Sequence, residues 1–402
     1  MHVFRRSSSR ADVQGSRMPK RRSGDRDGFR ASKRRRRHLY LVFDDWLWGY
    51  SIRKVNLSSS PSPSGSSNPN DGDGDGVDSP NNAFPAEHLM PPAVFRVEAQ
   101  RGFPQHFTAA ASGSKIIAVL SMRNGFEYRP SAPSASIPVF DLRRRAFTLG
   151  PRPEVDLVTP IFIPPGGRVF ALSADSFQFQ VLEPGSGRCG REGQWRKLQM
   201  HPSFKREFSV SSYALHPDGR TIFVSTASGG TFTFDTAAAG DSNWTEHGRW
   251  KLPFAGRAHF DPDLDVWIGF SRRKRTKGHL CACDAPRPDD GGERRPGWKV
   301  GKEKLFSEDP AEKHVGATLV CMEGQSEFCL VQCVSREDGC PPGDPLNVCR
   351  PCRYVCRLTT FSVRLGEEDG LPTVGDSRRV RCYKVPETTS GFTLGQPVAF
   401  WM

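Results

Sequence analysis

A loose repeat of paired hydrophobic strands is the sequence feature that most restricts how this chain can fold. Its copies recur roughly every 45–50 residues, a period in the range of β-propeller blades. The clearest copy begins at residues 213–220, where Pro-Asp-Gly supplies a tight turn, and continues with an alternating strand at 221–226. A Gly-Gly turn and a second strand at 231–235 complete the hairpin, and Trp244 begins a further strand. Weaker copies with the same order of elements start near residues 113, 166, 260 and 327.

This repeat predicts the fold class. Each unit is a small sheet that cannot bury both faces alone, so stacking the units around an axis is the economical arrangement. With a strand pair at 39–55 included, about six units fit the chain. We therefore predict an all-β fold, a single β-propeller-like domain of about six blades. Two packed β-sandwiches are the alternative, which would explain the strands but not the period.

The two ends of the predicted domain carry a second signal. Residues 397–402 are strongly apolar, whereas frayed chain ends are normally polar. A strand pattern also begins abruptly at Leu39. Pairing of the C-terminal segment with the first blade would explain both observations. We therefore expect residues 398–402 to close the ring.

Charge divides the chain into a tail and a folded body. Residues 1–37 hold fourteen Lys and Arg against three Asp, a net charge of +11, which leaves only +2 of the chain's +13 for residues 38–402. With almost no apolar content, the tail is predicted to be disordered. Residues 58–82 contain mainly Ser, Pro, Asn, Gly and Asp, which predicts a flexible insertion within the domain. We expect any polyanion binding to belong to the tail rather than to a groove on the fold.

The tail contains two basic clusters separated by ten residues, the spacing of a bipartite nuclear import signal that an import receptor would bind. The candidate residues are Lys20, Arg21, Arg22, Lys33, Arg34, Arg35, Arg36 and Arg37. A merely solvated tail and an organelle transit peptide are alternatives, although Asp12, Asp25 and Asp27 disfavour the latter. Non-specific contact with nucleic acid is a further use of such a tail. These patterns predict a nuclear or cytoplasmic protein, and no apolar run reaches the length of a membrane span.

The cysteines and the acidic insertion offer two metal-site candidates. Eleven cysteines, an odd number without a preceding signal peptide, indicate a reducing compartment. Cys340, Cys349, Cys352 and Cys356 form the most zinc-like cluster, but they lack a second close pair, so loop thiols are the favoured interpretation. Cys281 and Cys283 share one strand face and are expected to pack. Residues 71–76 alternate Asp and Gly like a calcium loop, yet Asn82 stands where a bidentate Glu is needed. No cofactor or metal is therefore predicted.

The sequence contains no Gly-x-Ser-x-Gly nucleophile motif, no His-Glu-x-x-His metal motif and no Walker-type phosphate loop. His216, His259, His279 and His314 recur near predicted blade edges, where histidines more often satisfy turn carbonyls than bind metals. Asp261, Asp263 and Asp265 are expected to form a hairpin turn. The chain is accordingly predicted not to be an enzyme.

Several motifs together resemble a known family. They are His-Leu-Tyr-Leu-Val-Phe-Asp-Asp-Trp at 38–46, Gly-Tyr-Ser-Ile at 49–52, Tyr-Ala-Leu-His-Pro-Asp-Gly-Arg-Thr at 213–221, His-Val-Gly-Ala-Thr-Leu-Val at 314–320 and the Pro-Val-Ala-Phe-Trp terminus. They are similar to an uncharacterised plant family, expanded in grasses and known only as a domain of unknown function. The resemblance spans roughly 38–402, outside the tail and the 58–82 insertion. It implies a plant source and a β-propeller similar to kelch and F-box-associated domains. It points to no particular activity, because none is established for the family.

The sequence therefore predicts a non-enzymatic protein-interaction module whose partner and process are unknown. Loops on a rigid propeller suit recognition, and the tail would direct nuclear entry. The alternative is an enzyme of the hydrolase or lyase type that uses a central propeller pocket. It would need inward-facing carboxylates or histidines from several blades.

Overall fold

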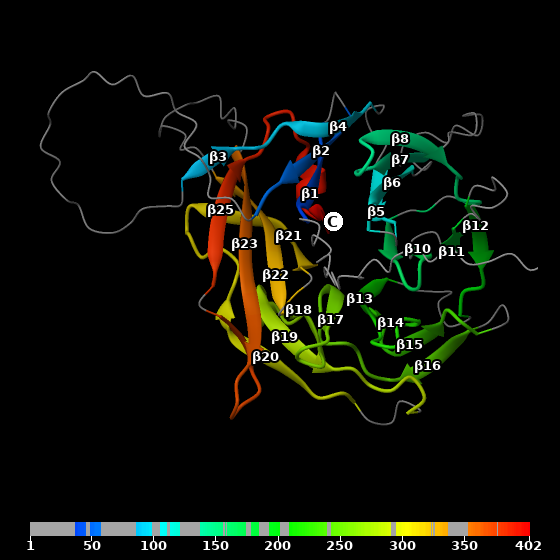
Figure 1. Ribbon diagram of the computed structural model, residues 1–402. Coiled ribbons are helices and arrows are strands. Elements are labelled where there is room, and N and C mark those ends of the chain that lie inside the picture. Colours follow the sequence, from blue (N-terminus) through cyan, green and yellow to red (C-terminus); the bar gives the residue numbers. More distant parts are fainter. Residues whose placement is uncertain are drawn as a thin grey trace, which may run out of the picture. The chain divides into compact units, whose positions relative to one another are not determined.

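The repeat in the sequence corresponds to a series of small, mostly antiparallel sheets, shown in the computed structural model of Figure 1. The structure describes residues 37–45, 49–57, 86–98, 105–110, 113–120, 137–155, 157, 159–173, 178–184, 193–201, 209–238, 243–290, 295–322, 324, 326–336, 353–375 and 377–402. Within these ranges the helical elements are single turns, α1 (Gly391–Leu394) and the 3-10 turn η3 (Lys274–Thr276). The predicted all-β class is confirmed.

The strands group into five hydrogen-bonded sheets within the described residues. The first contains β26 (Val398–Trp401), β1 (Leu39–Asp44), β2 (Tyr50–Val55) and β4 (Ala93–Val97). The second contains β5 (Gln105–Ala109), β6 (Lys115–Leu120), β7 (Ile137–Asp141) and β8 (Ala146–Gly150). The third contains β9 (Pro160–Ile163), β10 (Val169–Ser173), β11 (Gln178–Glu183) and β12 (Gln194–Leu198).

The other two sheets are larger. The fourth has eight strands, β13 (Val210–Leu215), β14 (Thr221–Thr226), β15 (Thr231–Asp235), β16 (Trp244–Gly248), β17 (Gly256–Asp261), β18 (Val266–Phe270), β19 (His279–Asp284) and β20 (Trp298–Lys304). Its two antiparallel halves meet where β13 pairs in parallel with β17. The fifth contains β21 (Glu312–Met322), β22 (Glu327–Arg336), β23 (Arg353–Leu365), β24 (Pro372–Val374), β25 (Arg379–Lys384) and β3 (Glu87–Leu89).

The turn between β13 and β14 shows how the repeat motif fixes its hairpin. The Asp218 carboxylate accepts hydrogen bonds from the backbone N–H groups of Arg220 and Thr221, at 2.8 and 2.9 Å. Gly219 has a φ of +70°, a conformation that suits glycine. The Pro-Asp-Gly sequence thus reverses the chain, and all six residues of β14 that follow are buried. The Asp261 carboxylate caps the β17–β18 turn in the same way, as predicted, through the N–H groups of Asp263 and Leu264.

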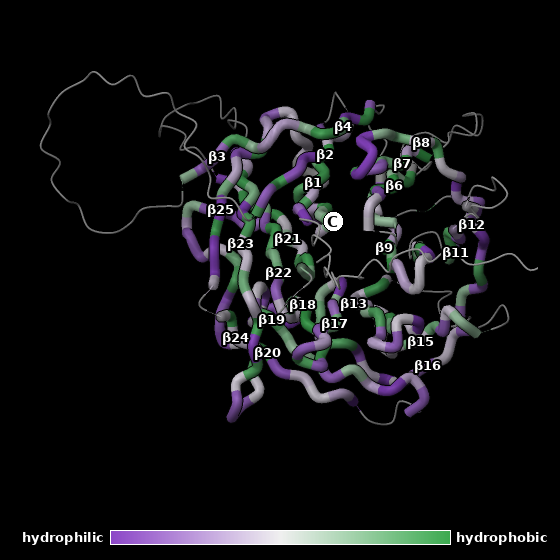
Figure 2. Tube along the Cα trace, viewed as in Figure 1, coloured by the Kyte–Doolittle hydropathy of each residue, from purple (hydrophilic) through white to green (hydrophobic). Residues whose placement is uncertain are grey.

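Burial on both faces of the strands places a hydrophobic core at each junction between sheets. In β1, Leu39 and Leu41 pack in a cluster shared with the fifth sheet, while Tyr40 and Val42 pack in one shared with the second sheet. Equivalent clusters join the second sheet to the third, the third to the fourth, the two halves of the fourth, and the fourth to the fifth. In Figure 2 the hydrophobic colour runs mainly through strands, and hydrophilic colour marks many connections at the lower edge.

These junctions form a closed cycle, because every sheet shares a core with the next and the fifth shares one with the first. Two β-sandwiches would instead give two separate cores. The described residues therefore form a propeller-like fold, as predicted.

The C-terminal strand closes this ring. β26 pairs antiparallel with β1, with Leu39 opposite Trp401 and Val42 opposite Val398. Beyond the ladder, the backbones of His38 and Met402 exchange hydrogen bonds of 2.8 and 3.0 Å. The C-terminus accordingly lies beside β1 in Figure 1. The expected ring closure by residues 398–402 is confirmed.

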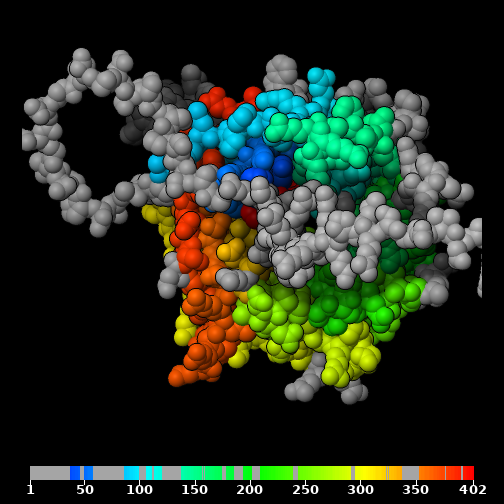
Figure 3. Space-filling view, viewed as in Figure 1, coloured from blue at the N-terminus to red at the C-terminus, as the bar shows by residue number. Residues whose placement is uncertain are grey.

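A second closure was not predicted from the sequence. β3, only three residues long, pairs in parallel with β25, so that Glu87 lies opposite Cys382. An N-terminal segment thus extends the last sheet, while a C-terminal strand extends the first. Figure 3 shows the cyan and red atoms of these segments side by side. The first sheet is therefore completed by a strand from the C-terminal end of the chain, and the last sheet by a strand from its N-terminal part.

Candidate functional site

A basic cavity lies between the two halves of the eight-stranded sheet. Its volume is about 290 Å³. The described residues that line it are Gly229, Arg249, Trp250, Lys251, Pro253, Arg272, Arg273, Arg295, Pro296 and Trp298. They come from the β14–β15 turn, the β16–β17 connection, the β18–β19 loop and the segment that leads into β20. Five of them are cationic and none is acidic. We call this site the basic cavity.

Backbone contacts fix the two loops that carry most of the cations. The β16–β17 connection pairs with the β18–β19 loop through a bridge between Phe254 and Ser271. The N–H of Arg272 donates to the carbonyl of Pro253 at 3.0 Å. The Ser271 hydroxyl lies 2.7 Å from that of Thr276, across the turn η3. These contacts hold the β18–β19 loop against the β16–β17 connection and so fix the backbone that carries Arg272 and Arg273.

The floor of the basic cavity is rigid because its aromatic parts belong to a core. Trp250 is 6% exposed and packs in the cluster between the two half-sheets. Phe254 and Trp267, at 0% exposure, lie in the same cluster. The indole N–H of Trp267 donates to the carbonyl of Leu215 at 2.9 Å, which ties β18 to the end of β13. The floor of the cavity is therefore set in well-packed structure.

The charged side chains face solvent at the cavity's mouth. Arg249, Arg272, Arg273 and Arg295 are exposed, and Lys251 is half-buried. The ammonium of Lys251 donates to the carbonyl of Ala227. None of the five forms an ion pair with a residue that the structure describes. Mutual repulsion among unpaired cations is unfavourable, and a bound anion would relieve it.

One cation of the cavity contacts an aromatic ring. The guanidinium carbon of Arg273 lies 4.4 Å from the ring centroid of Trp298, within the range of a cation–π interaction. Trp298 itself is 36% exposed. Charge and exposed aromatic surface therefore occur together at the mouth. This combination can bind an anion that has an apolar part.

Sequence reasoning missed the basic cavity. A net charge of +2 over residues 38–402 pointed away from any basic groove on the fold. The cavity is nevertheless basic, because a sum over a domain does not show where its charges lie; the expectation that polyanions bind the tail stays a prediction. The one sequence signal that could have indicated a basic site on the fold is the run of four basic residues that begins at Arg272. Their partners Arg249, Lys251 and Arg295 lie at least twenty residues away in the chain, and only the fold brings them together.

The import-signal candidates fall almost entirely outside the described residues. Lys20, Arg21, Arg22 and residues 33–36 lie in that part of the chain, as does the 58–82 insertion. Arg37, the last member of the second cluster, is exposed. The import hypothesis therefore stays a prediction. Among the described residues, no helix combines the length and apolar character needed to cross a membrane.

Each singled-out histidine has a local partner. His259 Nε2 lies 3.0 Å from the carbonyl of Leu319, and His279 Nδ1 lies 2.9 Å from that of Gly301. Both carbonyls belong to strands rather than to turns, so for these two histidines the expected turn contact is corrected to a strand contact. His216 does contact a turn, because its Nδ1 accepts a hydrogen bond from the N–H of Asp218 at 3.3 Å. Burial lowers the pKa of His259 to about 3, which keeps the ring neutral. His314 stacks on Phe306 with 4.4 Å between ring centroids.

The cysteines that the structure describes are packing residues. Cys281 and Cys283 are buried in the cluster beneath the basic cavity, as predicted, and burial raises the pKa of Cys281 to about 12. Cys356 is buried in β23, directly opposite Cys333 of β22, and a hydrogen bond with Cys333 together with burial raises its pKa. Cys340, Cys349 and Cys352 lie outside the described residues, so the zinc alternative stays untested.

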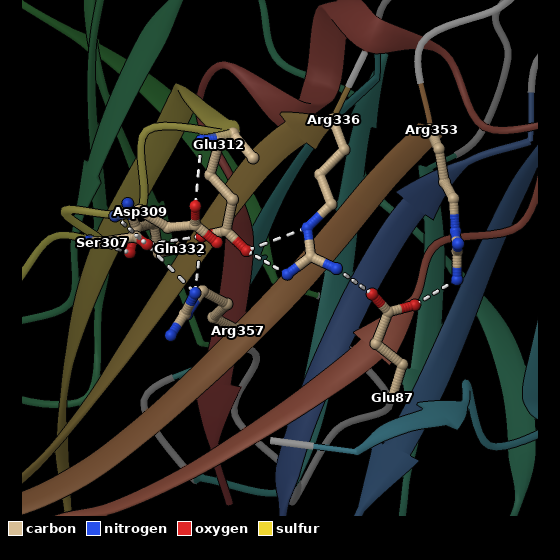
Figure 4. Close-up of polar contacts among 9 residues, drawn as sticks. Glu87, Ser307, Asp309, Glu312, Gln332, Arg336, Arg353 and Arg357 are labelled. Atoms are coloured by element: carbon tan, nitrogen blue, oxygen red, sulfur yellow. Dashed lines mark hydrogen bonds and ion pairs between the residues drawn. The ribbon is translucent and has the colours of Figure 1, made fainter. Parts of the chain in front are cut away.

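A second polar cluster lies in the last sheet, and Figure 4 shows it. The Glu312 side chain is fully buried and accepts hydrogen bonds from Ser307, Arg336 and Arg357, each as short as 2.5 Å. Arg336 also binds Glu87 of β3 at 2.5 Å, and Glu87 binds Arg353. We call Glu87, Glu312, Arg336, Arg353 and Arg357 the carboxylate–arginine network.

This network is structural rather than chemical. Burial raises the pKa of Glu312, but hydrogen bonds from Ser307 and Arg336 and the charge of Arg357 outweigh burial and leave that pKa below its ordinary value. A carboxylate held ionised by two arginines is a poor general acid or base near neutral pH. Its members come from β3, β21, β22 and β23, so the network connects the short strand β3 to the other strands of the last sheet. The basic cavity remains the better candidate for function.

The fold and this site define an all-β, propeller-like domain with a rigid basic cavity. The family described as "Protein of unknown function (DUF1668)" matches residues 36–383, and the chain belongs to this family. The resemblance to a domain of unknown function is thereby confirmed. A search of curated proteins gives no match.

Solved structures match this chain at low similarity. Hydrazine synthase of Kuenenia stuttgartiensis is 14% identical, with a TM-score of 0.37 over 69% of this chain and 66% of that one. A structural genomics protein of unknown function from Bacteroides thetaiotaomicron is 12% identical, with a TM-score of 0.37 over 60% of this chain and 57% of that one. Hsv2 of Kluyveromyces lactis is 10% identical, with a TM-score of 0.36 over 72% and 77%. This chain thus spans less than two thirds of the first two, and likenesses this low carry no argument.

Proposed function

We propose that the protein is a non-enzymatic interaction module whose basic cavity binds an anionic group on a partner protein. The observation that carries this proposal is the set of five cations around one cavity of about 290 Å³, without an acidic lining residue among those described. Arginine is favoured where proteins recognise carboxylates or phosphates, because its planar fork of N–H groups matches their oxygens. Four of the five cations are arginines.

The position of the cavity supports a binding role. Its lining comes from connections between strands, and such loops carry recognition when a rigid scaffold positions them. The core residues Trp250 and Phe254 anchor the β16–β17 connection, and the bridge between Phe254 and Ser271 ties the β18–β19 loop to it. A pre-positioned site loses less conformational entropy on binding. The domain therefore has a site suited to capture a charged group without rearrangement.

Finer features belong to the same proposal. We propose that the ring has six blades, with the eight-stranded sheet counted as two that meet at the parallel pair β13–β17. Six inter-sheet cores support that number. A plant source, a kelch or F-box-associated type of propeller and nuclear import through residues 20–37 extend the resemblance and the tail pattern. We propose them on those grounds alone.

Affinity co-purification tests the function. The bait is the full chain, compared with the double variant Arg272→Ala/Arg273→Ala. A matched control, Lys274→Ala/Arg275→Ala, removes the same charge from exposed residues of the same loop that do not line the cavity. We expect specific protein partners that the wild type and the control retain and the cavity variant loses. Partners held equally by all three proteins would place recognition elsewhere, and the proposed function of the cavity would be wrong.

A further inference from the structure

We infer that the basic cavity recognises a phosphorylated side chain carried by the partner protein. This inference rests on the proposed function and names the chemistry that the cavity selects.

The charge of the lining favours a dianion over a carboxylate. Arg249, Lys251, Arg272, Arg273 and Arg295 surround one space of about 290 Å³. A carboxylate brings one negative charge, and one bidentate arginine satisfies it. A phosphate monoester brings about 1.5 to 2 negative charges near neutral pH and three strong acceptor oxygens, which need several donors. Five cations that form no ion pair with a described residue match the second anion better than the first.

The apolar walls indicate that the phosphate is attached to a carbon group. Pro253, Pro296 and the exposed face of Trp298 line the same space as the arginines. Inorganic phosphate would gain nothing from such surfaces. The methylene or aromatic ring of a phosphorylated side chain would contact them, while its phosphate reaches the guanidinium groups. Arg273, which already lies over the Trp298 ring at 4.4 Å, stands where both parts of such a ligand meet.

The size of the site and the charge around it favour a peptide over a nucleic acid or a membrane. A cavity of about 290 Å³ is near the lower limit for small-molecule sites, which run from roughly 300 to 1,000 Å³. Nucleic-acid binding relies on a basic stripe that follows many phosphates, and residues 38–402 together carry only +2. The positive charge is concentrated rather than extended. One compact phosphate on a protein segment fits this pattern.

The arrangement of the loops makes the site ready for such a ligand. Ser271 and Thr276 close the base of the β18–β19 loop through their hydroxyl groups, and Arg272 is tied by its backbone to Pro253. The turn η3 then directs Lys274 and Arg275 to the surface as part of an exposed helical turn. Neighbouring basic residues of one loop are thus divided into two that line the cavity and two that do not. This division supplies an internal control.

Fluorescence polarisation with labelled peptide libraries tests the inference. The probes are libraries with a central phosphoserine, phosphothreonine or phosphotyrosine between randomised neutral flanks, and the same libraries without phosphate. We expect the full-length protein to bind at least one phosphorylated library about tenfold more tightly than its unphosphorylated counterpart, and Arg272→Ala/Arg273→Ala to remove most of that preference. Lys274→Ala/Arg275→Ala is expected to keep it. The variant Trp298→Phe should remove a tryptophan fluorescence change that phosphopeptide binding produces in the wild type.

Several results would overturn the inference. Equal affinity for phosphorylated and unphosphorylated libraries, or no binding of either, excludes a phosphorylated side chain as the ligand. So does binding confined to phosphatidylserine-containing vesicles or to a single-stranded oligonucleotide. Equal losses in the cavity and control variants would indicate general charge attraction. If co-purified partners depend on Arg272 and Arg273 but remain bound after phosphatase treatment, the inference fails while the proposed function stands.

Discussion

Removal of the buried carboxylate at Glu312 tests whether the carboxylate–arginine network stabilises the fold. The change is Glu312→Gln, which keeps the shape of the side chain but replaces one acceptor oxygen with a donor that faces two arginines. Loss of one partner from a buried ion pair costs about 3–5 kcal/mol. Here Arg357 and Arg336 are 17% and 23% exposed, and Arg336 keeps its bond to Glu87. Water and Glu87 offset part of the loss, so we expect about 3 kcal/mol.

Urea denaturation at neutral pH, followed by tryptophan fluorescence, measures this loss of unfolding free energy. At roughly 2 °C per kcal/mol for a large domain, the melting temperature should fall by about 6 °C. The matched control is Glu303→Gln, which breaks the exposed pair with Arg378 at 2.6 Å. An exposed pair contributes at most about 1 kcal/mol. If the two variants unfold at the same midpoint, the network does not stabilise the fold and the argument from burial is wrong.

The same variant has a defined pH dependence. The pKa of Glu312 in the fold lies below its ordinary value, so its ionised form stabilises the native state. That contribution is complete above the unfolded pKa of about 4.3 and is lost as the pH falls through the folded pKa. The difference in stability between wild type and Glu312→Gln should therefore be constant near neutral pH and shrink in acid. A difference that grows in acid would contradict the assignment.

Three further changes test the closure and the core. Deletion of residues 398–402 removes β26 from two inter-sheet cores, so we expect a lower melting temperature for the whole domain, and an unchanged transition would count against ring closure. In Gly316→Ala the new Cβ would lie 2.2 Å from the carbonyl oxygen of Gly395, so we expect the free energy of unfolding to fall by about 1–3 kcal/mol. In the control Gly375→Ala the close atom is the movable hydroxyl of Ser362, so the fall should be smaller. Trp267→Phe loses the hydrogen bond to Leu215 and leaves a small void, so we expect the free energy of unfolding, measured by urea denaturation, to fall by about 2 kcal/mol. A fall below about 0.5 kcal/mol would show that the indole does not connect the two half-sheets.

Local sequence patterns predicted the strands and hairpins, because these elements depend on hydrogen bonds and burial among residues that are close together in the chain. The Asp218 turn works through hydrogen bonds to residues two and three positions ahead, so its sequence alone specifies the hairpin. The apolar run from Leu39 predicted a strand, and the structure shows that its successive residues point into two different cores. The apolar terminus at 398–402 announced its pairing in the same way. The parallel strand β3 gave no such signal, because three residues are too few to show a period.

The sequence by itself determined the all-β class, the hairpins and the need for the C-terminal strand to be buried, because each depends on residues close together in the chain or on burial of apolar side chains. Tertiary structure alone decided where charge gathers. Arg249, Arg273 and Arg295 are distant in sequence and become neighbours only when two half-sheets pack over Trp250 and Phe254. Glu312 and Glu87 likewise find their arginines only after the last sheet has formed. Electrostatic interactions act through space, so the site appears only once the fold has set the distances.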